Sequence, residues 1–198
     1  MADPAYIDPA TNVLTDGEAW IGLATTTVVG AATATVTFTS PNDGSSTDWS
    51  QFMDLVLISY GRNGDGAASV MKMALNNDTG ANYSLQQLYG DGASVTGSST
   101  TTGTYLDFLW YPPSATAANV TACSIITLLD INSGKYKSST GQVANDMDGS
   151  GYVALVANAW ENQGPITEID LTDYSSVCCQ GWLPDGCYRS NRHNVFGG

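Results

Sequence analysis

The chain has 198 residues with 19 acidic and 6 basic side chains, for a formal net charge of −13. This length suits one domain, and 42% hydrophobic residues with only 13% charged residues argue against disorder. The acidic balance disfavours nucleic acid as a partner, since phosphate-binding surfaces are basic. No apolar run reaches the roughly 18 residues of a membrane span, and the N-terminus lacks the basic and apolar regions of a secretory signal. We therefore expect a chain that is made in a cytoplasm and stays soluble.

Strand signals dominate the sequence, whereas residues typical of exposed helices are scarce: Glu and Lys occur three times each. In residues 34–39, Val36 and Phe38 alternate with threonines, which indicates a strand with one buried face. Residues 52–60 are almost continuously apolar and predict a central strand, although residues 50–57 could begin as one helical turn. Further expected strands are residues 67–75, 83–89, 104–111, 120–131, 151–158 and 166–171. The sequence predicts an all-β fold, a jelly-roll-like antiparallel β-sandwich.

Both ends differ from this body. Residues 1–18 contain two prolines and little periodicity, and they predict an extended N-terminal arm. The sandwich is expected over residues 19–176. Residues 177–198 hold three of the four cysteines and the single histidine, and they predict a C-terminal tail. This tail could form a hairpin with strands at 177–182 and 187–196 around a turn at 183–186.

Clusters of Asn, Asp and Gly separate the expected strands. Asn76-Asn77-Asp78-Thr79-Gly80 and the Gly-Asp-Gly at 90–92 are typical of turns, because Asn and Asp bond their own backbone and Gly supplies positive φ. A carbohydrate or calcium loop is the alternative. Residues 146–151 match the first half of a calcium-binding EF-hand loop, but its twelfth position, which should be Glu, is Ala157. We therefore interpret these residues as a turn between strands and expect no metal and no cofactor.

The cysteines suit several arrangements. Cys178 and Cys179 are adjacent, which turns their side chains to opposite faces of a strand, whereas zinc thiolates are usually two to four residues apart. Cys178, Cys187 and His193 could still form a zinc site. A disulfide to Cys123, a disulfide between subunits and buried thiols are also open, with buried thiols as the default.

Catalytic signatures are weak. The single histidine, His193, leaves little room for a Ser-His-Asp triad, and neither a G-x-S-x-G nor a P-loop motif occurs. A pair of carboxylates for glycoside hydrolysis is possible among the aspartates, but no spacing favours one pair. We predict that the protein is not an enzyme.

Several segments together resemble a family of tailed-phage virion proteins that is common in aquatic phages. The resemblance spans residues 19–172 and is carried in order by Ala19-Trp20-Ile21, TATVTFTS, FMDLVLISY, MALNNDTGANYSL followed by GDGAS, TLLDINSGKYKS, DGSG and GPITEIDLT. It implies a jelly-roll-like fold and a place on the virion, as a capsid decoration (cement) protein or as a tail or fibre part. The Cys-rich extension after residue 172 and the N-terminal arm depart from the family pattern.

Between these two places we expect a decoration protein that braces the shell from outside, with the major capsid protein and copies of itself as partners, because one compact body with two short arms suits that role and no shaft repeats of a fibre protein occur. A homotrimer is expected from the three-fold geometry of capsids. Extended arms can order on a neighbouring subunit, so we predict subunit contacts at Tyr6, Arg189 and Arg192. The alternative is a tail module that binds host glycans through Trp110, Tyr111 and Trp160, although core packing is the commoner role of such aromatics.

Overall fold

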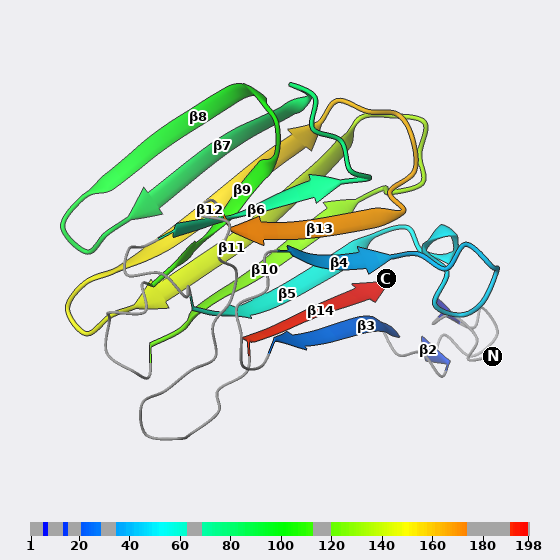
Figure 1. Ribbon diagram of the computed structural model, residues 1–198, viewed down its shortest axis with the longest axis horizontal. Helices are drawn as coiled ribbons and strands as arrows, with labels where there is room; N and C mark the ends of the chain where they lie inside the picture. Colours follow the sequence, from blue (N-terminus) through cyan, green and yellow to red (C-terminus); the bar gives the residue numbers. More distant parts are fainter. Residues whose placement is uncertain are drawn as a thin grey trace.

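A computed structural model describes residues 6–7, 14–15, 21–28, 35–62, 69–112, 120–173 and 191–197. Within these ranges it contains one short 3-10 helix, η1, and fourteen strands (Figure 1). Their bounds are β1 Tyr6–Ile7, β2 Leu14–Thr15, β3 Ile21–Val28, β4 Thr35–Thr39, η1 Trp49–Gln51, β5 Leu55–Gly61, β6 Ser69–Leu75, β7 Tyr83–Gly90, β8 Val95–Gly103, β9 Leu106–Tyr111, β10 Ala122–Leu129, β11 Lys137–Asp146, β12 Gly151–Trp160, β13 Glu168–Asp173 and β14 Asn191–Gly197.

Two antiparallel sheets pack face to face. The larger has eight strands in the order β3-β14-β5-β10-β11-β12-β7-β8, and the smaller has four in the order β4-β13-β6-β9. The smaller sheet covers one face of the larger, and the β7–β8 hairpin forms one end of the larger sheet (Figure 1). β1 and β2 pair separately as a two-stranded sheet. The predicted all-β, jelly-roll-like sandwich is confirmed.

The strand periodicity explains the two layers. In β4 the threonines are exposed while Val36 and Phe38 are buried, as the alternation predicts. β10 and β11 follow the same two-residue period, with one face buried beneath the smaller sheet. β4, β10 and β11 therefore each bury one set of side chains between the sheets and leave the other set outside.

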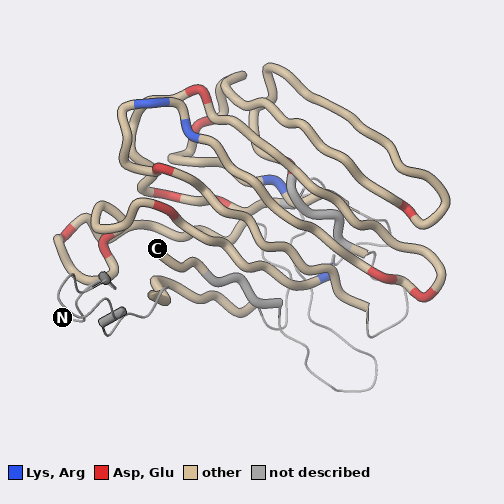
Figure 2. Tube along the Cα trace, turned by 180° about the vertical axis from the view of Figure 1, so that it is seen from behind, with Lys and Arg blue, Asp and Glu red and all other residues tan. Residues whose placement is uncertain are grey.

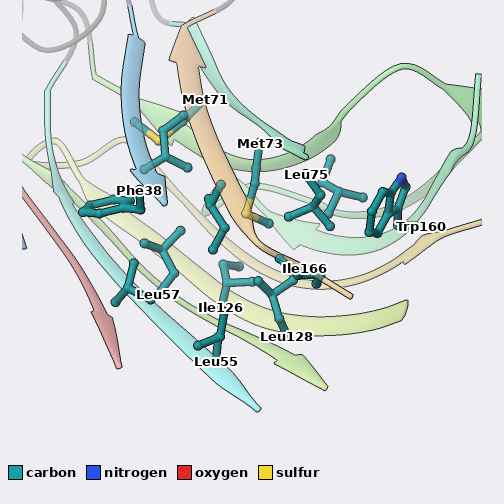
Figure 3. Packing of buried hydrophobic residues seen from close by; sticks show 14 of the residues in the cluster. Phe38, Leu55, Leu57, Met71, Met73, Leu75, Ile126, Leu128, Trp160 and Ile166 are labelled. Atoms are coloured by element: carbon teal, nitrogen blue, oxygen red, sulfur yellow. The ribbon is translucent and has the colours of Figure 1, made fainter. Parts of the chain in front are cut away.

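Aliphatic and methionine side chains from both layers fill the space between the sheets (Figure 3). Leu55 and Leu57 of β5 and Ile126 of β10 come from the larger sheet, and Met71 and Met73 of β6 meet them from the smaller one. All five are fully buried. Flexible methionines fit the irregular gaps that two twisted sheets leave.

The helical turn allowed for residues 50–57 is present but shorter and displaced. η1 spans Trp49–Gln51, and residues 55–57 already belong to β5. Asp48 caps the turn by accepting hydrogen bonds from the backbone N–H groups of Ser50 (2.9 Å) and Gly44 (2.7 Å). The buried Trp49 holds the turn against the core.

Besides β3, the larger sheet contains two further strands, β8 and β11, that were not among the expected strands. β8 reads VTGSSTTTG and β11 reads KSSTGQVAND, so neither carries an apolar alternation over its full length. Both are held by ladders to their neighbours, β8 to β7 and β11 to β10 and β12. Backbone hydrogen bonds to neighbouring strands place β8 and β11 in the sheet. Their side-chain patterns do not indicate this position.

The C-terminal strand corrects the expected tail. β14 lies inside the larger sheet, antiparallel to β3 on one side and to β5 on the other. Residues 191–197 thus belong to the sandwich, with Val195 fully buried in the core. The first strand and the turn of the expected hairpin, residues 177–186, lie outside the described residues. No helix among the described residues is long and apolar enough to span a bilayer.

Candidate functional site

The Asn-rich turn after β6, residues 76–80, is hydrogen-bonded to the segment that enters β13. Asn76 and Asn77 adopt left-handed backbone conformations with φ of 53° and 56°. The Asn76 side chain accepts hydrogen bonds from the backbone N–H groups of Thr167 (2.8 Å) and Glu168 (3.0 Å) and donates one to the carbonyl of Pro165 (2.7 Å). Its polar atoms are therefore engaged by the chain entering β13, and the turn interpretation of this cluster is supported by its contacts.

Asp78 is the hub of the same turn. Its carboxylate accepts hydrogen bonds from Trp160 Nε1 (2.8 Å), from Asn82 Nδ2 (2.9 Å) and from the backbone N–H of Gly80 (2.8 Å). Burial raises the pKa of this carboxyl, but the hydrogen bonds from Asn82, Trp160 and Gly80 outweigh that effect and hold the pKa below its ordinary value. The Tyr83 hydroxyl donates to the Asp78 carbonyl (2.9 Å). This network ties the β6–β7 crossover between the two sheets to the end of β12.

The predicted glycan-binding role of Trp160 is wrong. Its side chain is 1% exposed and stacks on the ring of Tyr83, with 6.3 Å between centroids. Its indole N–H is taken by Asp78. Trp110 and Tyr111 lie in β9, opposite Val70 and Ser69 of β6, and their side chains are outside the described part of the structure.

The predicted subunit contacts are spread over different elements. Tyr6 pairs with Thr15 in the small β1–β2 sheet. Arg192 lies within β14, so its backbone is part of the larger sheet rather than of a tail. Arg189 and the side chains of Tyr6 and Arg192 are outside the described residues. The contact role of these three residues stays a prediction.

Two tight turns meet at one end of the larger sheet. In residues 146–151 the Asp146 side chain accepts the backbone N–H of Asp148 (3.0 Å), and the strands close with Asp146 opposite Gly151. In the β7–β8 turn, the Asp91 carboxylate accepts the N–H groups of Ala93 (2.9 Å) and Ser94 (2.7 Å). A depression of about 420 Å³ lies between the two turns. Within the described ranges, no three His, Cys, Asp or Glu side chains gather as a metal site would need.

The outer face of the larger sheet, on the side away from the smaller sheet, carries a group of exposed apolar side chains that the sequence did not predict. We use the name outer patch for its exposed apolar side chains Leu88, Cys123, Ile125, Val153 and Leu155. Exposure reaches 63% for Val153, 56% for Leu155, 52% for Leu88 and 47% for Ile125. A shallow apolar hollow of about 200 Å³ lies over β10, β11 and β12 within this patch.

The ladder register explains why these residues adjoin. Leu155 of β12 lies opposite Leu88 of β7 on one side and opposite Gln142 of β11 on the other. Gln142 in turn lies opposite Ile125 of β10. Side chains from four neighbouring strands thus form one row across the face.

Six neighbouring strands of the larger sheet carry no charged residue between their ends, whereas β14 contains Arg192. β5, β7, β8, β10 and β12 contain no Asp, Glu, Lys or Arg, and β11 has only its first and last residues, Lys137 and Asp146. Lys137 is buried and donates to the carbonyls of Ser133 (2.5 Å) and Lys135 (2.7 Å). In Figure 2 these strands of the larger sheet are tan along their length, the colour of residues without charge, and red acidic residues lie at the turns. Sequence reasoning missed this face, and only the uncharged strand segments could have indicated it.

Cys123 also corrects an expectation. Buried thiols were the default for the cysteines, but Cys123 is exposed and not in a disulfide, on the outer patch. It lies opposite Tyr60 of β5 and Ala144 of β11. The other three cysteines, and with them the zinc and disulfide alternatives, lie outside the described residues.

A half-buried polar pair lies on the smaller sheet. Asp107 of β9 is opposite Lys72 of β6, whose ammonium is 4.2 Å from the centroid of the Tyr105 ring. Burial raises the pKa of Asp107 to about 6, and the charge of Lys72 only partly offsets this.

We expect Asp107 to make stability depend on pH. Because its folded pKa is above the unfolded value, the folded state binds the proton more tightly, and this contribution is lost as pH rises from about 4 to about 6. After screening by solvent, we expect the stability of the wild type to fall by about 1–2 kcal/mol relative to Asp107→Asn between pH 4 and pH 7. Urea unfolding followed by tryptophan fluorescence measures this difference. Parallel pH profiles for the two proteins would contradict it.

Comparison with models of known protein families, with curated proteins and with solved structures finds no match for this chain.

Proposed function

We propose that this chain is a structural protein of a tailed-phage virion, most simply a capsid decoration protein that stabilises the shell by bridging capsomers. The observation that supports the proposal is the partly apolar outer face that the larger sheet presents over β7, β10, β11 and β12, strands without charged residues between their ends. The family resemblance of residues 19–172 favours a place on the virion, either on the capsid or in the tail. The proposed partners are the major capsid protein and further copies of the chain, as in a homotrimer.

The distribution of charge favours assembly through this face. A chain of net charge −13 repels acidic neighbours wherever its carboxylates lie. On the outer face no carboxylate opposes contact between the strand ends, and Leu88, Val153 and Leu155 offer apolar area to bury. Contiguous exposed apolar side chains of this kind mark interaction sites on soluble proteins.

The proposed mechanism is mechanical. Each bound copy buries surface on two capsomers at once, so separating them requires that interface to be broken. The sandwich suits this role because its eight-stranded sheet is a broad layer backed by a buried core. No group of the protein changes chemically in this function.

Copy number in purified virions is the first test. Quantitative mass spectrometry compares this chain with the major capsid protein of the phage that encodes it. Comparable amounts are expected for a shell component. A few copies per particle would move the protein to the tail, and absence from particles would overturn the virion role.

A surface variant tests the face itself. We expect Leu155→Glu to weaken binding to capsids that lack this protein at least tenfold, because a buried, unpaired carboxylate strongly opposes association. Tyr136→Glu is the matched control: Tyr136 is 59% exposed, close to the 56% of Leu155, but it lies in the turn before β11. Equal binding of both variants, with unchanged folding by circular dichroism, would contradict use of the outer patch.

A further inference from the structure

β8 is an edge strand of unusual exposure. It closes the larger sheet at the end opposite β3, and among the strands that the structure describes it pairs with β7 alone. Every residue from Val95 to Thr102 is exposed, so the smaller sheet covers neither face of this strand. The outward backbone N–H and C=O groups of β8 are therefore open along one side.

β8 lacks the usual protection of an edge. Natural edge strands are commonly blunted by charged side chains, prolines or bulges, because an open edge is a template for another strand. The sequence VTGSSTTTG contains neither a charge nor a proline. Its one irregularity lies at the far end, opposite Tyr83 and Leu85, where Thr102 has a φ of 59°. From Val95 to Thr100 the ladder to β7 runs in regular register.

We propose that β8 is a self-association element that pairs antiparallel with β8 of a second copy about a two-fold axis close to Ser98. The pairing continues one sheet across two molecules. It rests on the proposed virion role and names a two-fold contact between copies that belong to neighbouring three-fold positions of the shell, separate from the contacts of the proposed homotrimer, and it is measured on the isolated protein.

Several features favour a second copy as the occupant. An antiparallel pair of identical strands is self-complementary, since each residue faces its mirror position in the partner. Threonine and serine side chains would then face each other across the new ladder, and such pairs stabilise sheets. The opposite edge strand, β3, is not exposed on both faces as β8 is, because its Leu23 and Ala24 side chains pack against the core.

Charge also permits this pairing. The nearest carboxylate before β8 is Asp91, in the turn that joins it to β7. Asp91 lies level with Ser94 in the tight turn, so with the axis at Ser98 the two Asp91 residues lie roughly 27 Å apart along the paired strands. Because charges are screened beyond about 10 Å in ordinary salt, these carboxylates do not oppose the contact.

The expected association is weak in dilute solution. One strand pair buries less than the roughly 1,200–2,000 Å² of a stable interface. Copies held side by side on a particle have a high effective concentration, which is sufficient for a weak contact to form.

Sedimentation equilibrium of the full chain between about 1 µM and about 1 mM covers the range of weak affinities. We expect the wild type to dimerise within this range. Thr96→Lys with Thr100→Lys should weaken dimerisation at least tenfold, because an axis at Ser98 sets residue 96 of one copy opposite residue 100 of the other. Ser46→Lys with Gln51→Lys adds the same charge at exposed positions far along the chain and should dimerise like the wild type.

Cysteine scanning locates the axis. Single cysteines at Thr96, Ser98 and Thr100, in a chain whose native cysteines are serine, should form disulfide dimers most at the position on the axis. A wild type that stays monomeric at the highest concentration, or a Thr96/Thr100 lysine variant that dimerises normally, would overturn the pairing. Either result together with a high copy number in virions would leave the virion role standing and remove only the β8 contact.

Discussion

Replacing Asp78 with Ala will lower the free energy of unfolding by about 1–3 kcal/mol, since a partly buried hydrogen-bond network loses its charged acceptor. The indole N–H of Trp160, in a side chain only 1% exposed, then has no partner within the fold. The amide of Asn82 and the backbone N–H of Gly80 lose the same acceptor. Denaturant unfolding followed by tryptophan fluorescence measures the loss.

Trp160→Phe provides the internal control for this network. It removes the indole N–H but keeps an aromatic ring beside Tyr83. Once that donor is gone, Asp78→Ala should cost at least about 1 kcal/mol less than in the wild type, because the penalty of an unpaired buried donor has been removed. Additive effects of the two changes would show that the contact between them contributes nothing.

Acid should weaken the same turn. The pKa of Asp78 is held below its ordinary value in the folded state. A group of this kind contributes stability above its unfolded pKa, and that contribution is lost as pH falls through the folded pKa. The Asp78 contribution therefore decreases on acidification, whereas that of Asp107 decreases as pH rises toward about 6.

The second large effect is expected at Gly141, in the middle of β11 on the buried face. A Cβ at this position would lie 2.0 Å from Ile126 Cδ1 and 3.0 Å from the backbone oxygen of Ile125. Gly141→Ala should therefore destabilise the protein by about 2–3 kcal/mol, as overpacked core positions do. Thermal and urea unfolding both measure this change.

A second substitution, at Ile126, tests whether the steric overlap with its Cδ1 atom causes this loss of stability. Ile126→Val removes the Cδ1 atom and by itself should cost about 1 kcal/mol. Added to Gly141→Ala, it should raise stability instead, because it removes the closest overlap. Gly134→Ala, with no atom within 4 Å of the added Cβ, is the control and should leave stability nearly unchanged. If Ile126→Val destabilises both backgrounds equally, the steric explanation is wrong.

The residue pattern allowed the fold class to be predicted for physical reasons. The alternation of Val36 and Phe38 with threonine defines a strand with one buried face, and β4 has that burial. Residues 76–80 indicate a turn because Asn and Asp stabilise left-handed backbone, which Asn76 and Asn77 adopt. Local preference and two-residue periodicity are properties of short segments, so a sequence displays them directly.

The candidate site was predicted far less well. Trp160 is a glycan-binding candidate only under the tail-module alternative, with core packing as the favoured role, and nothing in the sequence indicates that its indole is bonded by a carboxylate 82 positions earlier in the chain. The outer patch was not predicted, because its members come from four strands whose register is set only by the ladders. Residues that look ordinary one strand at a time become a surface only when those strands lie side by side.

The sequence by itself thus determined an all-β chain, most of its strands and the turns between them. Only the tertiary structure decided the place of β14 between β3 and β5, the burial of Trp160 and the openness of β8. The physical reason is that strand order, partner choice and burial depend on contacts between residues distant in the chain, whereas strand and turn preferences arise from neighbouring residues.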